Sequence, residues 1–263
     1  MNCIFICVFA QEKYVDMFFL LMESLVLYGN VGETAVLVYT STPFMHKMKQ
    51  NPFCEKVLFE TNDSYATIEK ACKARLDFFK FKTKYEKILY LDTDILVKDD
   101  VGKVFAVCKE DLLYVLEEGK LTDADGFYGG QTLFGAEMNN YADQTAFTSG
   151  ILLFPNSSTI QELFDRILAD MQARPSNLCC MDQPYIVYNA FKYNLFNNKI
   201  LKTLVVNNDF NVGSDKVIHH FPGGIGKSEN KIKVMTCFLN RLQRKPYFRM
   251  ALVALAILVL AKE

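Results

Sequence analysis

The chain has 263 residues, of which 51% are hydrophobic and 22% are charged, and its formal net charge at pH 7 is −1. This composition is typical of one globular domain, alone or with a small appendage, and excludes a largely disordered chain. The near-zero charge gives no basis for a nucleic-acid partner. The eight cysteines include no C-x-x-C pair, so we expect free thiols and a reducing, cytoplasmic setting.

The first third of the chain alternates apolar strands with amphipathic helices. Strands are predicted at residues 2–9, 35–39 and 56–59, and a helix is predicted at 15–28. A second helix is predicted at 63–81, because apolar residues recur there at spacings of three and four. This order indicates a doubly wound α/β sheet, in which ligands collect at the carboxyl ends of the strands.

The next predicted strand carries two carboxylates. Apolar residues at 88–91 and 95–97 flank Asp92, Thr93 and Asp94. A buried carboxylate is costly unless a cation or a donor satisfies it, and two of them suit a hard divalent cation such as Mn²⁺ or Mg²⁺. Aspartates that cap a turn after a strand produce the same short pattern, so the spacing alone leaves both interpretations open.

Three later segments place polar residues beside predicted strands or helices. Residues 147–150 read F-T-S-G before an apolar strand, and residues 182–184 read D-Q-P at the start of a helix. Residues 220–227 read H-F-P-G-G-I-G-K. Glycines in such a stretch let backbone N–H groups approach a phosphate, and its lysine adds a positive charge.

In their order and spacing, these segments resemble the motifs of glycosyltransferase family 8, which includes glycogenin and bacterial α-galactosyltransferases. The resemblance covers roughly residues 3–227. It implies a GT-A fold, which is a single α/β domain with a Rossmann-like mixed sheet and helices on both faces. It also implies a metal-dependent, retaining transfer of a hexose from a UDP-sugar to a glycan, lipid or protein acceptor.

The resemblance also implies the roles of individual residues. The ligands of Mn²⁺ or Mg²⁺ would be Asp92, Asp94 and His220. The donor would contact Ala10, Tyr14, Arg75, Asp92, Thr93, Thr148, Gly223 and Lys227. Asp182 and Gln183 would lie beside the anomeric carbon. Two positions depart from the family pattern: Thr148 replaces an asparagine, and Lys227 comes one residue later than usual.

Several of these residues have a purely structural alternative. Tyr14 would pack on the uracil ring, but aromatic residues are also ordinary near helix starts. Arg75 would bind the diphosphate through its guanidinium fork, or it would lie on the surface. Asp182 precedes a first-turn proline, so helix capping alone could explain it.

The sequence divides into a predicted transferase domain at 1–230 and an appendage at 231–263. The appendage has a basic helical part with Lys231, Lys233, Arg241, Arg244, Lys245 and Arg249, and then an apolar run at 250–261. That run is too short to span a bilayer. We expect it either to pack as a core helix or to make peripheral contact with a membrane, with the basic residues facing anionic lipid.

Two other functions fit part of the pattern. A catalytically silent nucleotide-sugar-binding protein would be compatible with the changes at Thr148 and Lys227. A haloacid-dehalogenase-type phosphatase also places D-x-D after a strand, with its first Asp as nucleophile. Those phosphatases have Thr or Val two residues after the second Asp, where this chain has Leu96, and their motif usually begins the chain.

Overall fold

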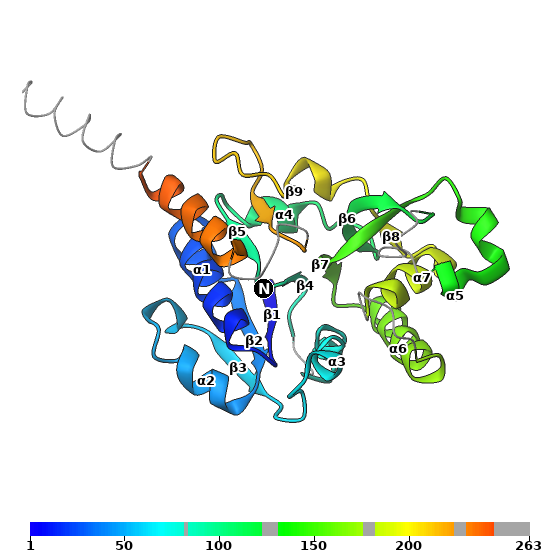
Figure 1. The fold of residues 1–263 in the computed structure, drawn as a ribbon, viewed down its shortest axis with the longest axis horizontal. Helices are drawn as coiled ribbons and strands as arrows, with labels where there is room; N and C mark the ends of the chain where they lie inside the picture. The colour runs from blue at the N-terminus through cyan, green and yellow to red at the C-terminus, as the bar shows by residue number, and fades with distance from the viewer. Residues whose placement is uncertain (82–83, 123–130, 176–181, 224–229, 245–263) are drawn as a thin grey trace, which may run out of the picture.

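The computed structural model describes residues 1–81, 84–122, 131–175, 182–223 and 230–244. Its main sheet has seven strands in the order β3-β2-β1-β4-β7-β6-β8 (Figure 1). Their bounds are β1 Cys3–Val8, β2 Ala35–Thr40, β3 Leu58–Thr61, β4 Lys87–Leu91, β6 Leu113–Lys120, β7 Thr145–Pro155 and β8 Phe196–Asn197. The strands β1 to β4 pair in parallel, and β7 is antiparallel to β4 and β6. The predicted mixed α/β sheet is confirmed.

A second sheet of three strands joins the first just after the paired aspartates. Its order is β5-β10-β9, with β5 Ile95–Val97, β9 Val205–Asn207 and β10 Ile218–His220. The α-helices are α1 Glu12–Tyr28, α2 Thr42–Met48, α3 Ile68–Ala71, α4 Gly102–Ala106, α5 Gln131–Phe134, α6 Ser158–Ala173 and α7 Gln183–Tyr193. The 3₁₀ helices are η1 Pro52–Cys54, η2 Ala74–Phe81, η3 Gly135–Tyr141 and η4 Leu201–Thr203. Residues 230–244 are also helical.

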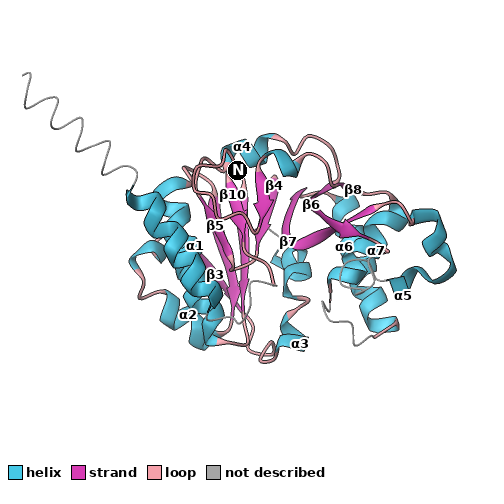
Figure 2. Ribbon diagram, turned by 45° about the horizontal axis from the view of Figure 1, so that its top comes forward, coloured by secondary structure: helices cyan, strands magenta, loops and turns pink. Residues whose placement is uncertain are grey.

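Two apolar cores lie on opposite faces of the main sheet, as the period of two in a strand requires. Along β1, Ile4 and Ile6 belong to the core that packs against α1 and α4. Phe5 belongs to the other core, which contains residues of η2, α6 and α7. Figure 2 shows helices on both sides of the strands. Continuous apolar strands such as β1 are therefore buried on both faces.

The predicted single helix at 63–81 is replaced by α3 and the 3₁₀ helix η2. Polar side chains before α3 form local turns instead of a first helical turn. The Asn62 carboxamide oxygen accepts from the backbone N–H of Ser64 at 3.0 Å, and the Asp63 carboxylate accepts from the backbone N–H of Thr42 at 2.7 Å. Such side chains compete with helix formation, and Thr67 then caps α3.

A buried carboxylate ties η2 to the sheet, and its removal should destabilise the protein. Asp77 accepts from the hydroxyl of Tyr65 at 2.5 Å and from that of Tyr39 at 3.3 Å. Asp77→Ala would leave the buried Tyr65 hydroxyl without its acceptor, while Tyr39 keeps its hydrogen bond from Asn62. We therefore expect a loss of about 1–3 kcal/mol in the free energy of unfolding in urea. Asp215→Ala is the control, because its side chain is 89% exposed. Equal stability of the two variants would contradict the role of Asp77.

The helix at 230–244 packs along α1 (Figure 1). Its residues Met235, Phe238 and Leu239 are buried in a cluster with Met17 and Phe221. This part of the predicted appendage therefore shares a core with the predicted domain, and the boundary at residue 230 stays a prediction. The apolar run at 250–261 lies outside the described residues, as do Lys245 and Arg249.

The predicted free thiols are observed at six of the eight cysteines. These are Cys3, Cys7, Cys54, Cys72, Cys108 and Cys237, whereas Cys179 and Cys180 lie outside the described residues. Across the described ranges, none of the helices combines the length and the apolar character needed to cross a bilayer.

Candidate metal and nucleotide site

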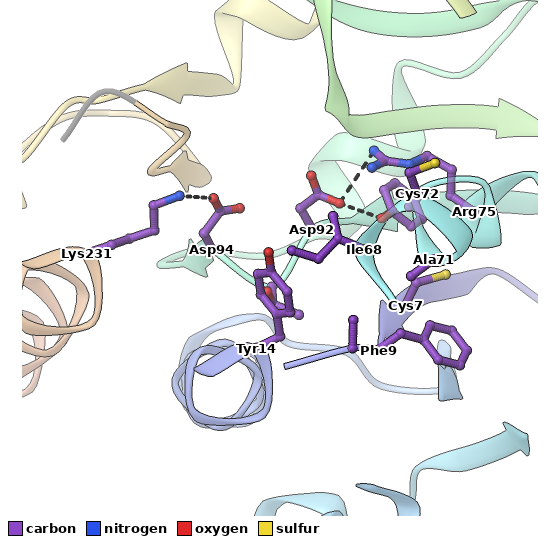
Figure 3. Close-up of a pocket in the computed structure, with 13 residues that line it drawn as sticks. Cys7, Phe9, Tyr14, Ile68, Ala71, Cys72, Arg75, Asp92, Asp94 and Lys231 are labelled. Atoms are coloured by element: carbon purple, nitrogen blue, oxygen red, sulfur yellow. Dashed lines mark hydrogen bonds and ion pairs between the residues drawn. The ribbon is translucent and has the colours of Figure 1, made fainter. Parts of the chain in front are cut away.

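A pocket of about 280 Å³ opens at the carboxyl ends of β1 and β4 (Figure 3). From β1 the chain passes through α1 to β2 on one side, while β4 pairs with β1 on the other. Ligands of open α/β sheets bind at this kind of switch point. The pocket is lined by Cys7, Phe9, Ala10, Tyr14, Ile68, Ala71, Cys72, Arg75, Tyr90, Asp92, Thr93, Asp94 and Lys231.

The two aspartates lie where the chain leaves one sheet and enters the other. Strand β4 ends just before Asp92, and β5 begins just after Asp94. The backbone N–H of Asp92 donates to the carbonyl of Gly150 at 2.8 Å, and the carbonyl of Asp94 accepts from the N–H of Phe221 at 2.9 Å. Both sheets therefore fix the backbone that presents the carboxylates.

His220 reaches the same point from β10, which pairs with β5. Its Nε2 lies 3.4 Å from Asp94 Oδ1, and its Nδ1 lies 2.8 Å from the amide oxygen of Asn207 on β9. An amide oxygen can only accept, so Nδ1 carries the hydrogen and the lone pair of a neutral ring is on Nε2, toward Asp94. His219 points elsewhere and packs against Phe238.

The residues present fit a divalent cation. Asp92, Asp94 and His220 each offer one potential ligand atom, and these three atoms all lie within 4.8 Å of one another. Asp94 Oδ1 is buried and has no hydrogen-bond partner in the described structure, so it is an acceptor without a donor. Burial raises the pKa of Asp94, but the positive charges of His220, when its ring is protonated, and of Lys231 outweigh it and hold the pKa below its ordinary value. Two carboxylates and an imidazole suit Mn²⁺.

Gly150 leaves the space that these ligands need. A Cβ added to Gly150 would lie 2.7 Å from both Cε1 and Nε2 of His220, and 3.0 Å from Asp92 Oδ2. Any side chain at this position would therefore enter the space between two of the three ligands. The F-T-S-G motif indicated a donor contact at Thr148 but gave no sign of this role for its glycine.

Arg75 is largely buried and lies between two carboxylates. Its Nε is 2.9 Å from Asp182 Oδ2, its Nη1 is 3.4 Å from Asp92 Oδ1, and its side chain is 12% exposed. Nη1 also donates to the carbonyl of Ser149. Burial lowers the pKa of Arg75, but Asp182 and Asp92 outweigh it and raise the pKa. The alternative of a surface arginine is wrong.

Asp182 and Gln183 do not line the pocket itself; Asp182 pairs with the pocket residue Arg75, and Gln183 is bonded to Ser149. The Asp182 side chain makes no capping hydrogen bond to α7, so capping does not explain it; its partner is Arg75. Burial raises the pKa of Asp182 to about 6, although Arg75 lowers it. The Gln183 amide oxygen accepts from the N–H of Ser149 at 3.1 Å. Their place beside the anomeric carbon stays a prediction.

Three more predicted donor contacts line the pocket. Tyr14 projects from α1 toward the aspartates (Figure 3), and Thr93 lies between them. Ala10 has a left-handed backbone, with φ of 69°, and a hydrogen bond joins the N–H of Gln11 to the carbonyl of Phe9 at 2.8 Å. This conformation is a tight turn that non-glycine residues rarely adopt. Rare backbone conformations of this kind cluster at binding sites.

Three other residues were predicted to contact the sugar donor, and none of them is among the described residues that line the pocket. The Thr148 hydroxyl accepts from the backbone N–H of Gly150 at 3.2 Å. Gly223 is exposed, and a Cβ added there would meet no described atom within 4 Å. Lys227 lies outside the described residues. The roles of these three residues stay predictions.

One prediction for the C-terminal helix is wrong. Lys231 does not face lipid, because its Nζ donates to Asp94 Oδ2 at 2.7 Å and lines the pocket. The sequence did not identify Lys231, Asn207, Gly150 or Tyr90 as site residues, although each contacts or borders a proposed metal ligand. Asn207 left a partial signal, since an asparagine-bearing segment precedes the histidine motif.

Comparisons with known proteins agree with this geometry. The family model for glycosyl transferase family 8 matches residues 30–213, which is more than half of the chain. No curated protein sequence matches significantly. The fold is similar to that of the galactosyltransferase LgtC in complex with donor and acceptor sugar analogs (TM-score 0.64, 14% identity, covering 89% of this chain and 95% of that one).

Two further solved structures have a similar fold. One is mouse xyloside xylosyltransferase 1 (TM-score 0.61, 12% identity, covering 86% of this chain and 99% of that one). The other is the bifunctional glycosyltransferase WbbM (TM-score 0.63, 15% identity, covering 89% of this chain). This chain spans about half of WbbM, at 49% of its length. The chain belongs to glycosyl transferase family 8 and is a glycosyltransferase with a GT-A fold.

Proposed function

We propose that this glycosyltransferase binds a divalent cation, Mn²⁺ or Mg²⁺, and transfers a hexose from a UDP-sugar with retention of configuration. The observation that carries the proposal is the cluster of Asp92, Asp94 and His220 at the switch point of the sheet, where the two aspartates line the pocket. The empty acceptor on Asp94 and the space kept by Gly150 support it. Family membership decides against the phosphatase alternative.

Several groups in and beside the pocket have a role in this proposal. The cation, held by Asp92, Asp94 and His220, would offset the negative charge that develops on the leaving diphosphate. Arg75, already beside Asp92, would bind a diphosphate oxygen through its guanidinium. Tyr14 and the turn at Ala10 line the side of the pocket next to α1, where the nucleoside would lie. Gln183 fixes the backbone of Ser149 beside the sugar.

The acceptor is proposed to be a glycan. The solved complex of LgtC contains donor and acceptor sugar analogs, and xyloside xylosyltransferase 1 is named for a sugar acceptor. A lipid or protein acceptor, and membrane contact through the C-terminal tail, stay predictions from the sequence. Which hexose is transferred depends partly on Thr148, where the family pattern has an asparagine.

Nucleotide binding tests the metal site directly. We expect UDP to bind in calorimetry with Mn²⁺ present and to bind about tenfold or more weakly with a chelator, because the diphosphate loses its main counter-charge. Asp94→Asn should remove this dependence, since it deletes a ligand charge with little change in volume. Equal UDP affinity with and without the chelator would contradict the metal site.

Turnover separates an active enzyme from a silent nucleotide-sugar-binding protein. The purified chain would be incubated with Mn²⁺ and a panel of nucleotide-sugars, and donor hydrolysis would be scored. An active transferase hydrolyses at least one donor slowly. Tight UDP binding without hydrolysis of any donor would favour the silent alternative.

A further inference from the structure

Lys231 connects the C-terminal helix to the metal site. Its Nζ lies 2.7 Å from Asp94 Oδ2, and both side chains are 14% exposed (Figure 3). The two residues are 137 positions apart in sequence. An exposed ion pair contributes little to stability, but this pair is largely shielded from water and sits on a carboxylate that the proposed function gives to a cation.

Two cationic side chains of the protein lie on the proposed metal ligands. Arg75 lies 3.4 Å from Asp92, and Lys231 lies 2.7 Å from Asp94. Each proposed carboxylate ligand therefore has a resident counter-ion from the protein. A divalent cation that used Asp94 would meet an ammonium already bound to one of its two oxygens.

We propose that Lys231 is the counter-ion of Asp94 that the divalent cation displaces, and that its released ammonium then binds the diphosphate of the donor. This inference rests on the proposed function. The three carboxylates of Asp92, Asp94 and Asp182 face two protein cations, Arg75 and Lys231. A divalent cation therefore changes the local net charge from −1 to +1, and the excess positive charge attracts an anion. A lysine ammonium on its flexible stem can exchange one acceptor for another. Lys231 and Arg75 line one pocket, so both can reach the same diphosphate.

The helix that carries Lys231 is fixed, so that only its side chain needs to move. Met235, Phe238 and Leu239 are buried against Met17 and Phe221. These contacts hold the helix, and with it the backbone of Lys231, beside the pocket. The same exchange makes metal and nucleotide binding mutually supportive, since each partner removes a cost of binding the other.

Two binding measurements on Lys231→Met test the inference. Methionine keeps an unbranched side chain and removes the charge. Mn²⁺ alone, followed by the electron paramagnetic resonance signal of the free ion, should bind about tenfold more tightly to the variant, because no ammonium competes for Asp94. UDP at saturating Mn²⁺, followed by calorimetry, should bind about tenfold more weakly, because the diphosphate loses a donor.

Lys233→Met is the matched control on the same helix. Lys233 is exposed and lines a separate groove with Phe210 and Phe238, so both affinities should stay unchanged. An equal change in both variants would show a general charge effect and overturn the inference. Lys231→Gln replaces Lys231→Met if thermal denaturation shows that the methionine variant is unfolded.

The outcomes separate this inference from the proposed function. If the unsubstituted protein binds Mn²⁺ and Lys231→Met binds it no more tightly, the counter-ion role is overturned and the metal site stands. Unchanged UDP affinity of the variant at saturating Mn²⁺ overturns the diphosphate contact. If neither protein binds Mn²⁺, the metal site itself is refuted, and the inference falls with it.

Discussion

Gly150→Ala is expected to weaken Mn²⁺ binding about a hundredfold or more and to remove turnover, because the added methyl group would occupy the space between two ligands. Its Cβ would lie 2.7 Å from His220 Nε2. The ring cannot easily retreat, since its side chain is 3% exposed and its Nδ1 is held by Asn207 at 2.8 Å. Asp92 is held in turn by Arg75 and the Tyr90 hydroxyl.

The effect of Gly150→Ala should be confined to the ligands. Thermal denaturation with and without Mn²⁺ separates metal binding from the stability of the fold. In Gly150→Ala the stabilisation by Mn²⁺ should vanish, while the metal-free variant should still unfold cooperatively. Gly213→Ala is the control, because a Cβ there meets only the exposed Asn211 side chain. Metal stabilisation that survives in Gly150→Ala would show that His220 and Asp92 do not share a cation.

Most of the fold could be predicted because its signals are local. The apolar runs of β1, β2 and β4 specify buried strands, and the spacing of apolar residues specifies α1 and α6. Capping residues also act locally: the Ser157 hydroxyl accepts from the backbone N–H of Ile160 and begins α6. The prediction of one helix at 63–81 was wrong because contacts with distant residues determine the backbone there. One example is the hydrogen bond from the N–H of Thr42 to the Asp63 carboxylate.

The site was predictable to the extent that a family motif marked it. Asp92, Asp94 and His220 were expected and lie together. Lys231 and Gly150 were missed for a physical reason: nothing in their neighbourhood along the chain sets them apart. Lys231 resembles any basic residue of a helix until the packing of that helix places it on Asp94, and Gly150 matters only through the distance of its missing side chain from His220.

Arg75→Met is expected to lower the free energy of unfolding by about 3–5 kcal/mol and also to weaken UDP binding, because Arg75 neutralises buried charge in the unliganded protein. The sequence left two alternatives for Arg75, a diphosphate-binding residue or a surface residue. The structure rules out the surface residue and adds a structural role. Arg75 is the partner of Asp182, which is 3% exposed, so its loss leaves a buried carboxylate without a cation.

The double variant Arg75→Met/Asp182→Asn distinguishes the two contributions of Arg75. Removing the unpaired charge should restore most of the stability, whereas UDP affinity should stay low because the guanidinium is still missing. Asp182→Asn alone is the matched single variant that completes the cycle. Recovery of both properties in the double variant would refute the diphosphate contact, and recovery of neither stability nor affinity would refute the pairing with Asp182.

The pH dependence gives an independent check on the same pair. Burial raises the pKa of Asp182 to about 6 from its ordinary 3.8, and Arg75 opposes the rise. Without Arg75 the pKa should rise further. A carboxyl with a raised pKa binds its proton more tightly in the folded state, so its contribution to stability is full below the unfolded pKa and is lost as the pH increases through the folded pKa.

The stability deficit of Arg75→Met should therefore be largest at pH 8 and should narrow toward pH 5, as urea denaturation at both values would measure. A deficit that is the same at pH 5 and pH 8 would mean that the unpaired charge of Asp182 is not its cause.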